Sequence, residues 1–211
     1  MYVLTLSDEV VPLVYSLHIR DRFRTVQLIL GCGDLPYYYL EYAVTMLGVP
    51  CFYVHGNHDA PELTGGGELV TEARGCTLLD DRVLRHAGII FAGLGGSMRY
   101  NAESRYQYTE RDMLLRVLRL TPRLLFNRLH YGRALDVLLT HAPPAGIHQG
   151  HDLAHRGFRA LRWLIEWARP RYLIHGHIHQ NYRMGTTTHT RHKHTAVINT
   201  ASHRVIWLDV S

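Results

Sequence analysis

The chain has 211 residues and 46% hydrophobic content, which favours one domain spanning residues 1–211 with one sizeable core. Its three cysteines form no C-x-x-C pair and no apolar stretch approaches the ~20 residues of a membrane span, so we expect a soluble, cytoplasmic protein without a membrane partner. The formal charge is +5, but basic and acidic residues are interleaved, so charge permits a nucleic acid partner without arguing for one.

The first part of the chain predicts a β-α-β unit. Short apolar runs at residues 3–6, 26–30 and 51–54 each lead into a polar loop, which is typical of buried strands. Residues 37–47, between the second and third runs, are long enough for a crossover helix that ends at Gly48. Polar side chains therefore gather where the predicted strands end.

The rest of the chain repeats this pattern. Residues 83–96 predict a hairpin that turns near Ala87-Gly88. Residues 109–133 favour a helix that is broken at Pro122. The remaining predicted elements are a strand at 135–140, a helix at 157–168, a strand at 171–174 and two or three strands within 182–209.

The side chains at the predicted strand ends are oxygen and nitrogen donors. They are Asp8, Asp34, Asn57, His141, His177 and His179. Because the ends of parallel strands meet at one edge of a sheet, residues far apart in sequence can converge there. Ligands of this kind without thiolate suit Mn, Fe or Zn and argue against an iron–sulfur cluster. We predict two such ions, with manganese favoured and Asp34 as a bridge, that activate water against a phosphate ester.

Four motifs in this order resemble those of the calcineurin-like metallophosphoesterases. They are GD at 33–34, GNHD at 56–59, TH at 140–141 and GHIH at 176–179. GNHD followed by GHIH is a specific signal. The resemblance implies an α/β fold, a four-layer α/β/β/α sandwich with two central mixed β-sheets and the metal site at the C-terminal ends of strands. It assigns Asp34, Asn57, His141 and His177 to one metal, and Asp8, Asp34 and His179 to the other.

The resemblance also implies a role for the histidine of GNHD. His58 would lie near the leaving-group oxygen as general acid or transition-state stabiliser, held by Asp59. Such a pairing is sensible chemistry independently of the family, since a carboxylate fixes the imidazole tautomer and raises its basicity. His58 and Asp59 are therefore the predicted catalytic residues.

The chain departs from the family at its first motif. Family members usually have Asp-x-His there, whereas this chain has Asp8-Glu9-Val10. Val10 cannot bind a metal through its side chain, so the second metal site has lost a ligand. We expect that site to be the weaker one, unless Glu9 or a histidine from another loop completes it.

Several other polar residues are weaker candidates. Arg99, beyond a glycine-rich turn, and His151 and His155, in the loop after His141, are the predicted substrate contacts. Lone histidines are more often structural than ligands, and a histidine-rich stretch near the end of the chain favours a solvated hairpin. The histidines interpreted in these two ways are His18, His55, His86 and His130, and His189, His192 and His194.

The sequence therefore predicts a metal-dependent phosphoesterase that hydrolyses a small-molecule phosphate mono- or diester. A nuclease acting on DNA or RNA is an alternative that the basic charge keeps open. A non-catalytic interaction module with a degenerate metal site is another, because of Val10. The presence of His58 and Asp59 argues against a non-catalytic module, because a protein that served only as a scaffold would have no evident use for these two residues beside the metal ligands.

Overall fold

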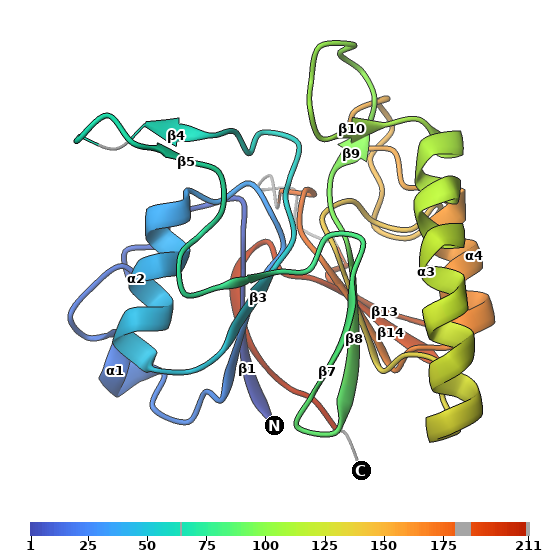
Figure 1. Cartoon of the computed structure of the whole chain (residues 1–211), viewed down its shortest axis with the longest axis horizontal. Helices are drawn as coiled ribbons and strands as arrows, with labels where there is room; N and C mark the ends of the chain where they lie inside the picture. The colour runs from blue at the N-terminus through green and yellow to red at the C-terminus, as the bar shows by residue number, and fades with distance from the viewer. Residues whose placement is uncertain (64, 180–186, 210–211) are drawn as a thin grey trace.

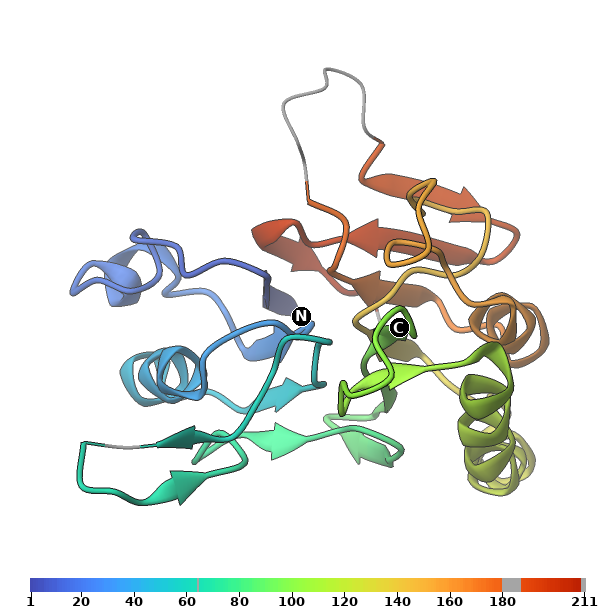
Figure 2. The same ribbon diagram turned by 90° about the horizontal axis from the view of Figure 1, so that it is seen from above.

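Two β-sheets face each other at the centre of the molecule, and helices cover the outer face of each (Figure 1). The computed structural model describes residues 1–63, 65–179 and 187–209. Seen from above, the two layers of helices lie on opposite sides of the paired sheets (Figure 2). This is the α/β/β/α sandwich that the sequence predicts.

The first sheet has the strand order β15-β1-β2-β3-β6 in the described part of the chain. Its strands are β1 (Tyr2–Ser7), β2 (Leu28–Gly31), β3 (Cys51–Tyr53), β6 (Thr77–Leu78) and β15 (Ser202–Trp207). Neighbouring strands are parallel except for β15, which runs antiparallel to β1. Helices α1 (Ile19–Arg22) and α2 (Tyr37–Leu47) lie on its outer side (Figure 1).

The second sheet has the order β13-β14-β12-β11-β8-β7 among the residues described. Its strands are β7 (Val83–His86), β8 (Ile89–Leu94), β11 (Val137–Thr140), β12 (Tyr172–His175), β13 (His189–His192) and β14 (Thr195–Asn199). The two edge strands are antiparallel to their neighbours and the inner strands are parallel. Helices α3 (Glu110–Tyr131) and α4 (Arg159–Ala168) cover its outer face (Figure 1).

Two short strand pairs lie in the connections. They are β4 (Glu62–Leu63) with β5 (Leu69–Val70), and β9 (Ser97–Met98) with β10 (Gln107–Tyr108). The predicted hairpin is present as β7 and β8, joined by Ala87 and Gly88 with φ of 48° and 84°. A two-residue turn between twisted strands favours two such left-handed residues.

Alternating side chains of the strands fill separate layers of core. In β2, Leu28 and Leu30 belong to the apolar cluster between the sheets, together with Phe91 of β8. Ile29 points the other way, into the cluster under α2 that contains Leu40. Because both faces of these strands are buried, their sequences are continuously apolar rather than alternating.

Helix α3 runs through Pro122, so the predicted break is wrong. Its start is fixed by Thr109, whose side chain accepts the Asp112 N–H at 3.2 Å. Pro122 is exposed, while Val117 and Leu120 on the inner side are buried in the core of the second sheet. Proline disfavours a helix interior by ~3 kcal/mol. Burying several apolar side chains, each worth ~1.5–3 kcal/mol, outweighs that.

The last predicted region is only partly described, since Tyr182 at its start lies outside the described residues. Its later part forms β13, β14 and β15 as separate strands, which agrees with the prediction. Within the described residues, every helix is too short or too polar to cross a membrane.

Candidate metal centre

The predicted ligands follow the C-terminal ends of strands from both sheets. Asp8 follows β1, Asp34 and Asn57 come after β2 and β3, and His141 and His177 come after β11 and β12. The backbone is left-handed at Asp8, Asp34 and His177, with φ of 66°, 55° and 66°. Non-glycine residues rarely adopt this conformation, and such strain concentrates at functional sites.

Two motif glycines let these loops approach one another. A Cβ on Gly33 would overlap the backbone of Gly56 and lie 2.8 Å from His141 Nδ1. A Cβ on Gly56 would overlap the carboxylate of Asp34. The glycines of GD and GNHD are therefore needed because the loops they belong to touch.

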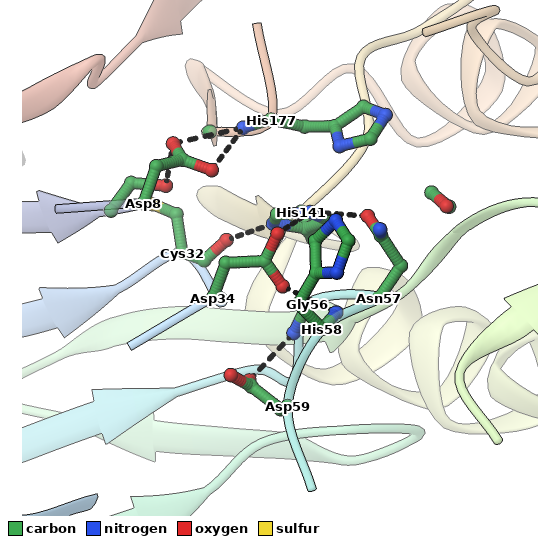
Figure 3. Close-up of polar contacts among 12 residues, drawn as sticks. Asp8, Cys32, Asp34, Gly56, Asn57, His58, Asp59, His141 and His177 are labelled. Carbon is green, nitrogen blue, oxygen red and sulfur yellow. Dashed lines mark hydrogen bonds and ion pairs between the residues drawn. The ribbon is translucent and has the colours of Figure 1, made fainter. Parts of the chain in front are cut away.

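His141 presents a nitrogen lone pair to two oxygens. Its Nδ1 lies 2.7 Å from the carbonyl oxygen of Cys32, which can only accept, so Nδ1 donates (Figure 3). With the proton on Nδ1, the lone pair of Nε2 faces Asn57 Oδ1 at 3.0 Å and Asp34 Oδ2 at 3.3 Å. Three acceptors that face one another repel unless a cation lies among them, so these residues fit a metal ion.

The pKa shifts of His141 and Asp34 also indicate that a positive charge between them is favourable. Burial acts to lower the pKa of His141, but the charge and hydrogen bond of Asp34, with the charge of Asp8, raise it to about 9. Burial acts to raise the pKa of Asp34, but His141 and the N–H of His58 hold it well below its usual range. A proton or a metal ion can supply the charge that the carboxylates attract.

His177 is held as a neutral ligand. Its Nε2 donates to the carbonyl oxygen of Ala154 at 2.8 Å, which leaves the lone pair on Nδ1. Burial and the neighbouring charge of His141 lower its pKa to about 3. Ligand atoms of Asp34, His141 and His177 lie within 4.8 Å of one another. Together with Asn57, the structure thus brings together the residues predicted for the first metal.

The residues predicted for the second metal are less closely gathered. The carboxylate of Asp8 accepts the backbone N–H of His177 at 3.0 and 3.1 Å and the hydroxyl of Ser7 at 2.5 Å. Burial raises the pKa of Asp8, while the charges of His141 and His179 oppose that rise. His179 is exposed, and Val10 is 37% exposed. In the part of the chain described, the compact three-residue group includes neither Asp8 nor His179.

The predicted pairing of His58 with Asp59 is replaced by a different arrangement. His58 donates its backbone N–H to Asp34 Oδ1 at 2.8 Å, and its side chain is exposed. The carboxylate of Asp59 accepts the N–H of Gly56 at 2.8 Å and that of Leu35 at 3.1 Å. Asp59 therefore joins two loops whose amides lack strand partners, because a buried N–H needs an acceptor. Burial raises the pKa of Asp59 to about 6.

The three predicted substrate contacts lie in different surroundings. Arg99 donates to the Gln107 carbonyl and to the Asp112 carboxylate, both at 3.2 Å, so it supports the start of α3. His155 hydrogen-bonds Asp152 at 2.9 Å, and its ring centroid is 5.0 Å from that of His177. His151 is exposed in the same loop. Of the three, His155 is the one whose ring lies against a residue of the candidate centre.

Sequence reasoning missed Tyr100. Asn57 Nδ2 donates to the Tyr100 hydroxyl at 3.2 Å, which directs Asn57 Oδ1 toward His141. Tyr100 follows Arg99 in a stretch without a motif, so no sequence signal identifies it. His55, in contrast, is structural as predicted. It is buried, hydrogen-bonded to Asp80 at 2.8 Å and stacked on Tyr106.

The sequence profile of the calcineurin-like phosphoesterase family matches residues 18–181. A comparison with curated protein sequences gives no match. One solved structure aligns over 99% of this chain and 99% of its own, at 16% identity and a TM-score of 0.63. The GAP50 anchor of the inner membrane complex of Plasmodium aligns over 94% and 70%, at 14% identity and a TM-score of 0.48. A single mutant of Vps29 from Entamoeba histolytica aligns over 96% of this chain and 74% of its own, at 17% identity and a TM-score of 0.43.

At 16% identity the first structural match supports the fold alone, whereas the profile match rests on the sequence itself and covers most of the chain. Members of the matched family are usually phosphoester hydrolases and typically bind divalent metal ions. The chain belongs to the calcineurin-like phosphoesterase family.

Proposed function

We propose that this protein hydrolyses a small-molecule phosphate mono- or diester with the help of bound metal ions. The observation that carries the proposal is the convergence of Asp34, His141 and His177 within 4.8 Å, with Asn57 Oδ1 facing the same imidazole nitrogen. This group joins loops of both sheets and attracts positive charge, which either a proton on His141 or a metal ion supplies. It fits a cation, and the family membership supports phosphoester chemistry.

The two predicted ligand sets would be occupied unequally. Asp34, Asn57, His141 and His177 would hold one divalent ion, and Asp8, Asp34 and His179 would hold a second, more weakly. The oxygen and nitrogen donors suit Mn, Fe or Zn, and manganese is the ion that we propose first. Bound ions lower the pKa of a water toward ~7 and stabilise charge on the phosphoryl oxygens.

The protein's own groups would orient the centre and move a proton. The carbonyl oxygens of Cys32 and Ala154 fix the tautomers of His141 and His177. The exposed ring of His58 lies beside a cavity of about 310 Å³ that Asp34 also lines. A leaving-group oxygen in that cavity would be within reach of the His58 imidazole, which would donate the proton it needs.

The test is a panel of nitrophenyl phosphate and bis-nitrophenyl phosphate with Mn(II), Fe(II), Zn(II) and Mg(II) added to metal-stripped protein. We expect hydrolysis that depends on metal and is lost in Asp34→Asn. His18→Ala is the control, since His18 is exposed and belongs to none of the motifs. If neither ester is cleaved with any of these ions, the proposed function is wrong and the non-catalytic alternative gains.

The same metal-stripped protein with added ions distinguishes a nuclease from an enzyme that acts on small molecules. DNA and RNA are offered at low and high salt, because phosphate contacts make binding strongly salt-dependent. Cleavage of either polymer much faster than of the nitrophenyl esters would move the substrate class from small molecules to nucleic acid.

A further inference from the structure

A second cavity, of about 780 Å³, lies between the starts of α3 and α4 and the loop after His141. Its lining includes Glu110, Gln149, Arg156, Arg159, Arg162 and Trp163. None of these residues is among the predicted metal ligands. Helices α3 and α4 lie side by side at this edge of the molecule (Figure 1).

The acidic side chains of this cavity are already engaged. Glu110 accepts the backbone N–H groups of Arg159 at 3.1 Å and Ala160 at 2.7 Å, so it caps α4. Glu166 pairs with Lys193 at 2.8 Å and His192 at 3.0 Å. The oxygens of Glu110 are thus occupied by backbone amides and Glu166 is paired with Lys193, so both carboxylates bind groups other than Arg156 and Arg159.

Two of the three arginines have no acidic partner among the residues that the structure describes. Arg162 donates to the Ala145 carbonyl at 3.3 Å and pairs with Glu166 at 3.4 Å. For Arg156 and Arg159, no ion pair forms with any residue that the structure describes. Guanidinium groups bind phosphate oxygens in a matching fork geometry, so a phosphate-bearing ligand suits them.

An aromatic surface stands beside these arginines. Trp163 is 43% exposed, and its ring stacks on Trp167 with centroids 6.0 Å apart and an interplanar angle of 7°. An exposed indole that is held in place is a platform for a planar ring such as a nucleobase. Gln149 stiffens the facing wall, because its Oε1 accepts the N–H groups of Gly146 and Gly157 at 2.9 and 3.3 Å.

One loop joins this cavity to the candidate metal centre. Ala154 accepts a hydrogen bond from His177 at 2.8 Å, and the His155 ring is 5.0 Å from the His177 ring. The next residue, Arg156, lines the cavity. A single ligand that carries a phosphate ester and extends past His155 would therefore reach both places.

We propose that the cavity binds the nucleotide part of the substrate, with phosphate on Arg156 and Arg159 and the base on Trp163. The statement about substrate class rests on the proposed function, because it narrows the proposed substrates to phosphoesters that contain a nucleotide. As a binding site it can be measured without metal and without turnover.

The binding test uses metal-stripped protein with ADP, adenosine and inorganic phosphate, followed by calorimetry. We expect ADP to bind more tightly than either part. Losing charged hydrogen bonds to phosphate should weaken ADP binding by ~10–100-fold in Arg156→Gln/Arg159→Gln, and Trp163→Leu should weaken ADP and adenosine alike. The controls are Arg123→Gln on the exposed side of α3 and Trp207→Leu, whose side chains lie outside the cavity.

Two results would overturn the proposal: no ADP binding by the wild type, or binding by the cavity variants as tight as by the controls. Because Trp163→Leu removes a ring stack and could unfold, thermal melting is compared first. The single variant Arg159→Gln, on an exposed side chain, serves if Trp163→Leu does not fold.

An activity arm separates this proposal from the proposed function. With Mn(II) present, KM for the nitrophenyl ester of thymidine 5′-phosphate should rise in the cavity variants relative to KM for nitrophenyl phosphate. ADP binding without hydrolysis of any ester would support the cavity and refute the proposed function. Hydrolysis of both esters without ADP binding would support the function and refute the cavity.

Discussion

His58 contacts the metal-binding group through its backbone, since its N–H donates to Asp34 while its imidazole is exposed. Removing the imidazole should therefore leave the group intact. We expect His58→Ala to keep its metal content and to lower kcat by ~10²–10⁴-fold, the usual loss for a proton-transfer group. The measurement compares esters with good and poor leaving groups, and the loss should be larger for the poor one. An unchanged rate with both would refute the acid role.

Asp34 is the side chain shared by both predicted metal sites. A neutral carboxamide bridges two cations poorly, so Asp34→Asn should lose metal from both sites together. Metal content after dialysis against Mn(II) is measured by atomic spectroscopy. Asp21→Asn, which makes the same change at an exposed carboxylate of α1, is the control. Two ions at full occupancy in Asp34→Asn would exclude a bridging role.

Val10 stands where the family usually has a histidine, and it is 37% exposed, so a larger side chain fits there. We expect Val10→His to tighten the second Mn(II) without changing the first. Strand β1 ends at Ser7 and the backbone is left-handed at Asp8. The imidazole at position 10 therefore has to approach the Asp8 carboxylate, and the metal beside it, from outside the strand. Titration of metal-stripped protein gives both affinities. Equal affinities in wild type and variant would indicate that Glu9 or another histidine already completes the site.

Helix α3 contains a proline whose cost in helix stability is outweighed by the burial of the helix's apolar face. Pro122 removes one backbone hydrogen bond from the helix interior. Pro122→Ala should raise the free energy of unfolding by ~1–3 kcal/mol, the helix propensity difference less the entropy that proline removes from the unfolded chain. Urea denaturation measures this, with exposed Arg123→Ala as control. No gain in Pro122→Ala would mean that the helix already accommodates the ring without strain.

The sequence predicts those helices and turns that are determined by their own residues and immediate neighbours. The sequence predicts a helix at 37–47 because the span between two strands is long enough for a crossover and ends at Gly48, and this matches α2. The Ala87-Gly88 turn is predicted between two strands, and both of its residues have positive φ. The predicted break at Pro122 is wrong because the burial that keeps α3 continuous comes from packing against side chains of the second sheet. Propensity describes the helix alone, whereas the outcome depends on what packs against it.

The same division holds for the candidate centre. The motif residues Asp34, Asn57, His141 and His177 were identified because their side chains carry the chemistry. The groups that orient them include the carbonyl oxygens of Cys32 and Ala154, which any residue could supply. The sequence predicts that Asp59 holds His58, whereas the structure shows its carboxylate accepting two backbone N–H groups. Contacts to the backbone leave no pattern in the sequence.

At the scale of the whole molecule, a metal ion would join the two sheets. Asp34 and Asn57 follow strands of the first sheet, and His141 and His177 follow strands of the second. Mn(II) at 100 times its Kd should stabilise the fold by ~2.7 kcal/mol, or ~5–10 °C in Tm. Calorimetric melts with Mn(II) and with EDTA measure this. An equal shift in Asp34→Asn would mean that the ion acts elsewhere.

The pairing of β1 with β15 bears on how the protein is made. The amino group of Met1 donates to the Leu208 carbonyl, 207 positions away, and Val3 lies opposite Ile206 across the same ladder. Of the strands of the first sheet, β1 is synthesised before the others and its antiparallel partner β15 after them. Its free edge can pair with other nascent chains until then, which is the hazard of an open strand. Such long-range pairing also slows folding, so we expect this edge of β1 to stay unpaired until β15 has been synthesised.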